Sequence, residues 1–166
     1  GRRTTRRNRS GRCAMKWMLV AGFWLLSGLR AWAAPLTLQP VAPNIWFAQG
    51  DAALGTPENR NFISNAGVIV TPAGVVVVDA LGSPAVAADL LEAIRRITPL
   101  PVRYVILTHY HADHIYGLQV FKDQGATVLA HEAGREYLQS DTAQLRLQAT
   151  RESLAPWVDA KTRLVP

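Results

Sequence analysis

Cysteine is almost absent from this chain of 166 residues, since the only one is Cys13, close to the N-terminal end. From Ala34 onward there is none, which excludes a disulfide, a thiolate nucleophile and a cysteine-ligated metal in that part of the chain. Glycine-rich phosphate-binding patterns are missing too, because neither GxGxxG nor a P-loop sequence occurs. Any catalytic or metal-binding chemistry there must therefore use other side chains.

Acidic residues are absent before Ala34, and that segment contains eight of the chain's 18 lysines and arginines. The formal net charge of +6 comes from this imbalance. From Ala34 onward 10 basic and 12 acidic residues remain, which leaves a balance of about −2. The basic pI of the whole chain would suggest nucleic-acid binding, but the body of the chain lacks the excess charge. We therefore expect no nucleic-acid partner.

A long apolar run is also missing. The longest stretch, Trp17–Leu29, has thirteen mostly apolar residues, whereas a spanning helix needs about 20. It follows Met15 and Lys16, and it precedes an A-x-A sequence made by Ala31 and Ala33. This layout is typical of a secretory signal peptide rather than a membrane anchor.

The expected domain organisation follows from this leader. Residues 15–33 form the signal peptide, with cleavage after Ala33, and residues 1–14 are an Arg-rich segment upstream of a plausible start methionine. The mature part, residues 34–166, is expected to be periplasmic or secreted, with no stable membrane anchor after cleavage. Its oligomeric state does not follow from the sequence.

Strand and helix patterns alternate along the mature part and predict the α/β class. A TPAG turn at 71–74 joins two apolar runs into a hairpin, and the second run has four consecutive valines, which indicates a strand buried on both faces. Ser83 and Pro84 are typical of a helix start, and Asp141 is expected to cap a later helix. The expected strands are 61–70, 74–80, 102–108 and 127–131, with a further approach to a strand over 159–166; the expected helices are 83–98, 115–124, 132–139 and 141–155.

Three of the four histidines lie within six residues, in the sequence THYHADHIYG that follows the strand 102–108. The pattern is His109-x-His111-x-Asp113-His114. Imidazole nitrogen and carboxylate oxygen are both good ligands for zinc. Because sites in open α/β sheets form outside the carboxyl ends of strands, this placement favours a metal site over a structural histidine cluster. Asp113 could also orient a nucleophile or carry a proton.

The HxHxDH sequence after an apolar strand, with Gly117 three residues further on, resembles the signature of the metallo-β-lactamase superfamily. The resemblance implies an αββα sandwich, of which about Leu36 to Pro166 would be the N-terminal half. It also implies that His109 and His111 bind a first metal and that Asp113 and His114 bind a second. The opening PLTLQPVAPNIWFAQG is similar to a periplasmic branch associated with sulfur oxidation or quinoprotein relay.

Further residues take their expected roles from the same resemblance. Asp79 matches the aspartate that braces the metal loop by hydrogen bonding. The sequence Asp79-Ala80-Leu81-Gly82 is one residue longer than the family's turn. His131 comes too early to be the family's third histidine ligand and is expected to be structural, so the remaining ligands are expected beyond Pro166. Tyr110 and Tyr116 flank the metal loop and are candidates for a substrate pocket.

Two functions remain open on these residues. One is an exported, dinuclear zinc hydrolase that uses metal-bound hydroxide on an ester, thioester, lactone or lactam. The other is a metal-binding or redox-accessory protein on the same fold, with iron in place of zinc, or an inactive fragment. An isolated half-sandwich would expose the inner face of its sheet, so we also expect residues 34–166 to aggregate or to be poorly stable alone.

Overall fold

The computed structural model describes residues 1 and 35–165. The expected signal peptide at 15–33 lies outside the described residues, as does the upstream segment apart from Gly1. The described part contains six strands and five helices: β1 (Gln39–Ala42), β2 (Ile45–Ala48), β3 (Ala66–Thr71), β4 (Gly74–Val78), α1 (Pro84–Ile97), β5 (Val102–Ile106), α2 (Ala112–Ile115), α3 (Leu118–Lys122), β6 (Thr127–Leu129), α4 (Glu132–Leu138) and α5 (Asp141–Ser153).

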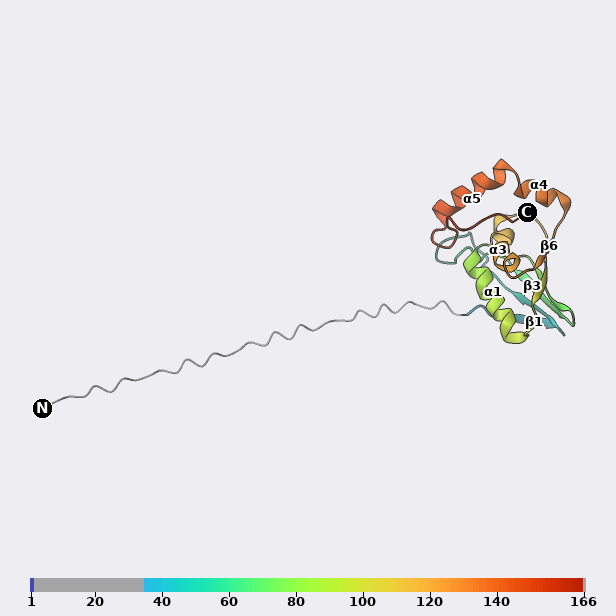
Figure 1. The fold of residues 1–166 in the computed structure, drawn as a ribbon, viewed down its shortest axis with the longest axis horizontal. Helices are drawn as coiled ribbons and strands as arrows, with labels where there is room; N and C mark the ends of the chain where they lie inside the picture. Colours follow the sequence, from blue (N-terminus) through green and yellow to red (C-terminus); the bar gives the residue numbers. More distant parts are fainter. Residues whose placement is uncertain (2–34, 166) are drawn as a thin grey trace. The chain divides into compact units, whose positions relative to one another are not determined.

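The strands form one mixed sheet in the order β1-β2-β3-β4-β5-β6 (Figure 1). The first four strands pair antiparallel, and β4-β5 and β5-β6 pair parallel. The TPAG turn closes the β3–β4 hairpin as predicted, and Gly74 adopts a φ of 137°, which favours glycine. Each parallel step needs a helical crossover, which α1 provides between β4 and β5. The α/β prediction is therefore confirmed.

The core lies between one face of the sheet and the helices α1 and α3. Val68, Val77 and Val105 share a row across β3, β4 and β5 and are fully buried. From α1, Leu90 and Ile94 join them, one turn apart on the same helix face. The helix begins as its sequence predicts, since the Ser83 side chain accepts a hydrogen bond from the Val86 amide and Pro84 occupies the first turn.

The opposite face of the sheet is apolar but only partly covered. Ile45, Ile69, Val76 and Tyr104 lie in one cross-strand row. Tyr104 is 45% exposed, and Ile106 and Leu129 in the neighbouring row are 39% and 45% exposed. One helical layer on one sheet is half of an αββα arrangement, so this apolar face is the face that such a sandwich would bury.

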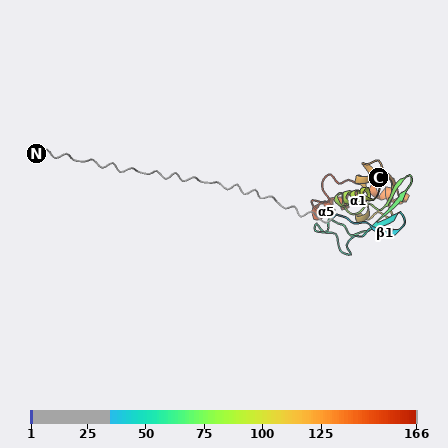
Figure 2. The same cartoon turned by 90° about the horizontal axis from the view of Figure 1, so that it is seen from below.

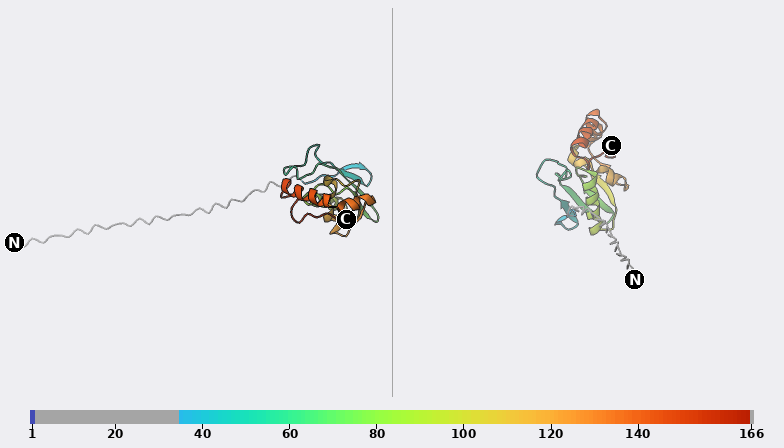
Figure 3. Two further views of the ribbon diagram at one scale, coloured as in Figure 1. Left: turned by 90° about the horizontal axis from the view of Figure 1, so that it is seen from above. Right: turned by 90° about the vertical axis from the view of Figure 1, so that its left-hand side faces the viewer.

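Helices α4 and α5 lie at the end of the domain away from β1 (Figures 1 and 3). Figure 2 shows the same part of the chain from below, with the α1 label between those of α5 and β1. The strands β5 and β6 run toward α4, so the loops after them gather at this end. None of the helices within the described residues is long and apolar enough to span a membrane.

Three local predictions are wrong. The helix expected over 115–124 begins earlier and is split into α2 and α3, because the chain turns tightly at Tyr116–Gly117. The cap of α5 is Ser140, whose side chain accepts from the Ala143 amide, and Asp141 is the first helical residue. The strand expected from position 61 begins at Ala66. The segment 159–165, expected as the approach to a strand, has a turn at 160–161 in which the Asp159 carboxylate accepts from the Thr162 amide, and irregular chain after it.

Candidate metal centre

The histidine cluster lies where β5 ends and α2 begins. β5 is fixed on both sides by its parallel neighbours, so its carboxyl end delivers the loop from Leu107 to His111 to one edge of the sheet. His111 is the N-cap residue of α2, and Asp113 and His114 lie in the first turn of that helix. The structure therefore places His109, His111, Asp113 and His114 next to one another, and their role as metal ligands stays a prediction.

Asp79, just after β4, connects this loop to the neighbouring strand. Its backbone has a φ of 64°, and its side chain is 7% exposed. Its Oδ1 accepts from the Thr108 amide at 2.9 Å, while its Oδ2 accepts from the Thr108 hydroxyl at 2.7 Å and from His114 Nδ1 at 2.8 Å. The prediction that Asp79 braces the loop fits these contacts.

These contacts also set which ring nitrogens carry protons. A carboxylate only accepts, so His114 presents Nδ1–H to Asp79 and its Nε2 carries the lone pair when the ring is neutral. The Thr108 hydroxyl donates to Asp79 and therefore accepts from His109 Nδ1, 2.9 Å away. Asp79 thus acts on His114 directly and on His109 through Thr108. Both rings keep Nε2 free, which is the form that a metal ligand needs.

The three imidazole rings are packed against one another. The ring centroid of His109 lies 4.6 Å from that of His111 and 4.1 Å from that of His114. Burial lowers the pKa of His109, and repulsion from His114 and His111 lowers it further. The His109 ring is therefore held in the neutral state that binds metal.

One pair of donors has the spacing of ligands on a single ion. Oδ2 of Asp113 lies 3.3 Å from Nε2 of His114, so with a neutral His114 ring protonated on Nδ1 these two atoms are both acceptors, and either a proton or a metal ion between them would satisfy both. Two bonds of about 2.0–2.1 Å that meet at a tetrahedral angle place their donor atoms about 3.3 Å apart. Within residues 35–165, no group of three or more His, Cys, Asp or Glu side chains is arranged to hold an ion. The donors fit zinc in chemistry, and this pair fits it in spacing.

Sequence reasoning missed the loop that supports the site from the other side. The Ser64 hydroxyl donates a short hydrogen bond to the Asp113 carbonyl. Asn61 Nδ2 donates to the Gly82 carbonyl at 2.7 Å, and the Ser83 hydroxyl donates to the Arg60 carbonyl. Arg60 and Asn61 both have positive φ values, 56° and 59°. Asn61 and Ser64 are isolated polar residues in a loop, so no pattern in the sequence indicated that they support the metal-binding loop.

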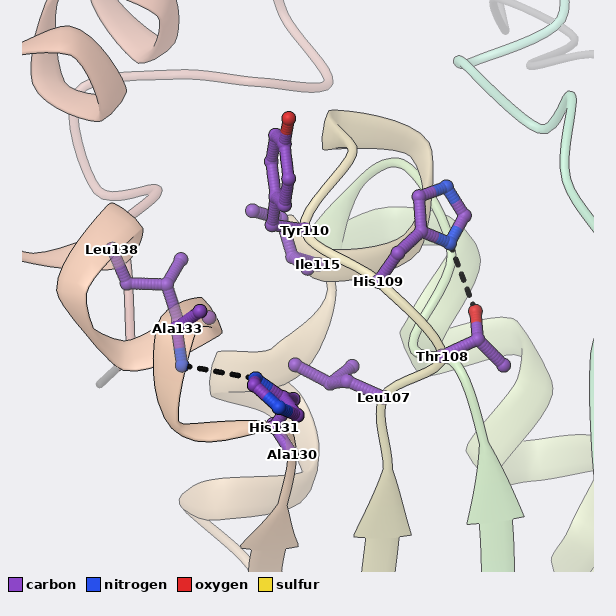
Figure 4. Close-up of a pocket in the computed structure, with 10 residues that line it drawn as sticks. Leu107, Thr108, His109, Tyr110, Ile115, Ala130, His131, Ala133 and Leu138 are labelled. Atoms are coloured by element: carbon purple, nitrogen blue, oxygen red, sulfur yellow. Dashed lines mark hydrogen bonds between the residues drawn. The ribbon is translucent and has the colours of Figure 1, made fainter.

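The three remaining candidate residues, His131, Tyr116 and Tyr110, lie in different environments. The His131 side chain accepts from the Ala133 amide and caps α4, which fits its predicted structural role. Tyr116 is buried in the core, 2% exposed, with its hydroxyl 3.4 Å from Thr150, so it does not line an open pocket. Tyr110 is 43% exposed and does line a pocket between the loop after β5 and α4 (Figure 4).

Comparison with known proteins gives a consistent result. The family model "Metallo-beta-lactamase superfamily" matches residues 59–162. A metallo-beta-lactamase type 2 of Bacillus cereus is 29% identical over 90 residues, which cover 54% of this chain and 34% of that protein. A linear primary-alkylsulfatase of Pseudomonas sp. (strain ATCC 19151) is 33% identical over 54 residues, 32% of this chain and 10% of that protein. The chain thus spans about a third of the length of the first of these curated relatives and a tenth of the second.

The fold is shared with solved structures. The mono-zinc form of the metallo-beta-lactamase FIM-1 from Pseudomonas aeruginosa superposes with a TM-score of 0.52 at 19% identity. The superposition covers 62% of this chain and 45% of that one. At this identity the likeness concerns the fold alone, and it agrees with the single helical layer and sheet seen in residues 35–165.

Proposed function

The chain belongs to the metallo-beta-lactamase superfamily, and from this premise we propose that the protein is an exported, metal-dependent hydrolase with two zinc ions. Its substrate is a small molecule with an ester, thioester, lactone or lactam bond. The observation that carries the proposal is the cluster of three histidines and Asp113 at the end of β5, oriented by the buried Asp79. The members of the family matched above, a β-lactamase and an alkylsulfatase, are hydrolases by name.

His109 and His111 would hold one ion, and Asp113 and His114 the other. Zinc in such a site acts as a Lewis acid and lowers the pKa of water to about 7, which supplies a nucleophile at neutral pH. His109 contributes a neutral ring whose free Nε2 is set by Thr108. Asp113 is 25% exposed and can accept a proton from the nucleophile or pass one to the leaving group.

The export part of the proposal rests on the sequence of residues 15–33. The apolar run and the A-x-A sequence are typical of a signal peptide. The acidic balance of the chain from Ala34 onward supports a small-molecule substrate rather than nucleic acid.

The test is elemental analysis of the purified chain after zinc loading and gel filtration, with His109→Ala, His111→Ala, Asp113→Ala and His114→Ala in parallel. We expect bound zinc in the parent chain and a reduced content in each variant. His131→Ala is the matched control, because His131 caps α4 and is not in the cluster. Equal zinc in all five variants would remove the proposal, and retention of iron instead would favour the redox-accessory alternative.

Hydrolysis is tested separately in the whole protein rather than in residues 1–166 alone, with a panel of ester, thioester, lactone and lactam substrates and zinc present. We expect turnover of at least one bond type that is lost in Asp113→Ala and kept in His131→Ala. Zinc binding without turnover of any of the four would reject the hydrolase and leave a metal-binding protein.

A further inference from the structure

The helix α2 carries both residues proposed to hold the second metal ion, Asp113 and His114. It has only four residues, and two of its carbonyl groups are bonded to segments outside it. The His114 carbonyl accepts from the Ala80 amide at 2.9 Å, and the Asp113 carbonyl accepts from the Ser64 hydroxyl. A helix of one turn has little stability of its own, so these outside contacts determine how α2 is oriented.

The two proposed ligands are supported in different ways. His114 is held at its ring by the Asp79 carboxylate and at its main chain by a backbone amide. Within residues 35–165, the only polar contact of the Asp113 carboxylate is with His114 Nε2, 3.3 Å away. In the same part of the chain, Ser64 provides the only side chain that bonds the main chain of a residue in the histidine cluster. The position of Asp113 therefore depends on Ser64 more than that of His114 does.

Ser64 is itself fixed to the sheet. It is 6% exposed and lies two residues before β3. Gly50, just after β2, lies against its main chain, because a Cβ added at Gly50 would overlap the Ser64 carbonyl oxygen. The Gly50 amide donates to Oδ1 of Asn65 at 3.1 Å, which closes the base of the loop 50–65. The Ser64 hydroxyl thus reaches α2 from a position set by the pairing of β2 with β3.

Loss of this hydroxyl should affect one metal ion more than the other. The ligands proposed for the first ion, His109 and His111, precede α2, and His109 is oriented through Thr108. None of these contacts involves Ser64. Without the hydroxyl, the main chain at Asp113 would be free to shift, and its carboxylate would face the second ion for less of the time.

We propose that Ser64 is a positioning residue for the second metal ion. Its hydroxyl holds the main chain of Asp113, so that the carboxylate faces Nε2 of His114 and both side chains can bind one ion. The inference rests on the proposed dinuclear site and adds to it a residue that acts through Asp113. Residues that hold metal ligands by hydrogen bonds are typically worth about 10–100-fold in metal affinity.

The test is a zinc titration of the metal-free whole protein, measured by calorimetry and with a competing chelator. The parent protein should bind two ions. Ser64→Ala should keep the affinity for the first ion and lose about 10–100-fold for the second. Ser140→Ala is the matched control, because it also removes a serine hydroxyl that donates to a main-chain carbonyl, that of Tyr137 at 2.7 Å, but at the start of α5. It should bind both ions like the parent.

Nuclear magnetic resonance identifies which site is affected. The 15N shifts of the His109 and His111 rings report the first ion, and those of the His114 ring report the second. In the metal-free protein, the 13C shift of the Asp113 carbonyl should move upfield in Ser64→Ala, because its hydrogen-bond donor is lost. A loss of overall stability alone would produce neither change, so these shifts separate positioning from a general structural role.

Circular dichroism and thermal melting check that Ser64→Ala is folded. If it is not, Asn65→Ala at an exposed position keeps the Ser64 hydroxyl but opens the base of its loop, and it should give a smaller loss confined to the second ion. Unchanged affinity for the second ion in the folded variant, or an equal loss for both ions, would overturn the inference and leave the dinuclear site intact. Fewer than two zinc ions in the parent protein would reject the dinuclear site itself, and the role of Ser64 with it.

Discussion

The Oδ2 oxygen of Asp79 lies 2.8 Å from Nδ1 of His114, so a residue after β4 determines which nitrogen is free on a histidine after β5. The same oxygen accepts the Thr108 hydroxyl at 2.7 Å. One buried carboxylate therefore orients two of the rings in the cluster. All the groups in this arrangement are the chain's own residues.

Replacement of Asp79 by asparagine should weaken both stability and zinc binding. The side-chain NH2 group of asparagine donates hydrogen bonds and cannot accept them. It would therefore face another donor, either the Thr108 amide or His114 Nδ1, and that hydrogen bond would be lost. We expect a loss of about 2–3 kcal/mol in the free energy of unfolding and of about 10–100-fold in zinc affinity. Urea denaturation and zinc titration measure the two effects.

Backbone strain would not account for such a loss, because asparagine adopts the positive φ of position 79 as readily as aspartate does. A variant with unchanged zinc affinity would show that Asp79 does not position the ligands.

Thr108 should fix the tautomer of His109. In Thr108→Val the partner of His109 Nδ1 is lost, and we expect the ring to populate both neutral tautomers, whereas the parent chain has the proton on Nδ1. The 15N chemical shifts of the His109 ring measure the ratio directly in the metal-free protein. Thr108→Ser keeps the hydroxyl and should restore the parent pattern, so a tautomer ratio that is the same in all three proteins would contradict the role.

The cluster and its brace could be predicted from the sequence because they are contiguous or follow strands. HxHxDH is one local motif, and the resemblance to the metallo-β-lactamase superfamily assigned the bracing role to Asp79, which directly follows an apolar run typical of a buried strand. Ser64 and Asn61 could not be predicted for their roles, because their partners are backbone carbonyls of Asp113 and Gly82 in other segments. Every residue has a backbone carbonyl, so a hydrogen bond to one does not require a particular side chain at the accepting position and cannot be recognised from the sequence.

Local boundaries were harder to predict where two signals compete. Asp141 and Ser140 are both good capping residues, and the structure uses Ser140. The split between α2 and α3 depends on how closely Gly117 approaches the turn after β4, which is a tertiary contact.

The pH dependence of stability in the metal-free chain should include a contribution from His109. Its folded-state pKa lies below 6.5, because burial and the neighbouring His114 and His111 disfavour its charged form. Below pH 6.5 the unfolded chain takes up a proton that the folded chain resists, so stability falls as the pH decreases toward the folded pKa. His109→Gln should reduce this slope. Denaturation curves at several values between about pH 5 and pH 8 test it, and an identical slope in both proteins would contradict the shift.

Gly117 should be intolerant of any side chain. A Cβ at this position would overlap the carbonyl oxygen of Ala80 and would press on the Ala87 side chain in α1. The Gly117 amide also donates to the Leu81 carbonyl at 3.1 Å, so the loop cannot move away freely. We expect Gly117→Ala to cost at least about 3 kcal/mol, the upper part of the range for overpacking.

Gly125 provides the comparison for that substitution. It has a φ of 88° but no neighbour within 4 Å of an added Cβ. Gly125→Ala should therefore cost only the conformational term, about 1–2 kcal/mol. Equal losses at the two glycines, measured by thermal or urea denaturation, would show that the close approach at Gly117 is unimportant.

The partly exposed sheet face should control whether residues 34–166 remain monomeric in isolation. Tyr104 and Ile106 on β5 are 45% and 39% exposed, whereas Val105 between them is fully buried against the helices. Ile106→Lys adds a charge to the open face and should reduce self-association without loss of structure. Val105→Lys places the same charge in the core and should unfold the chain. Light scattering and circular dichroism separate the two outcomes. If the parent protein is already a stable monomer, the open face does not drive aggregation, and lysine at position 106 should then leave its solubility unchanged.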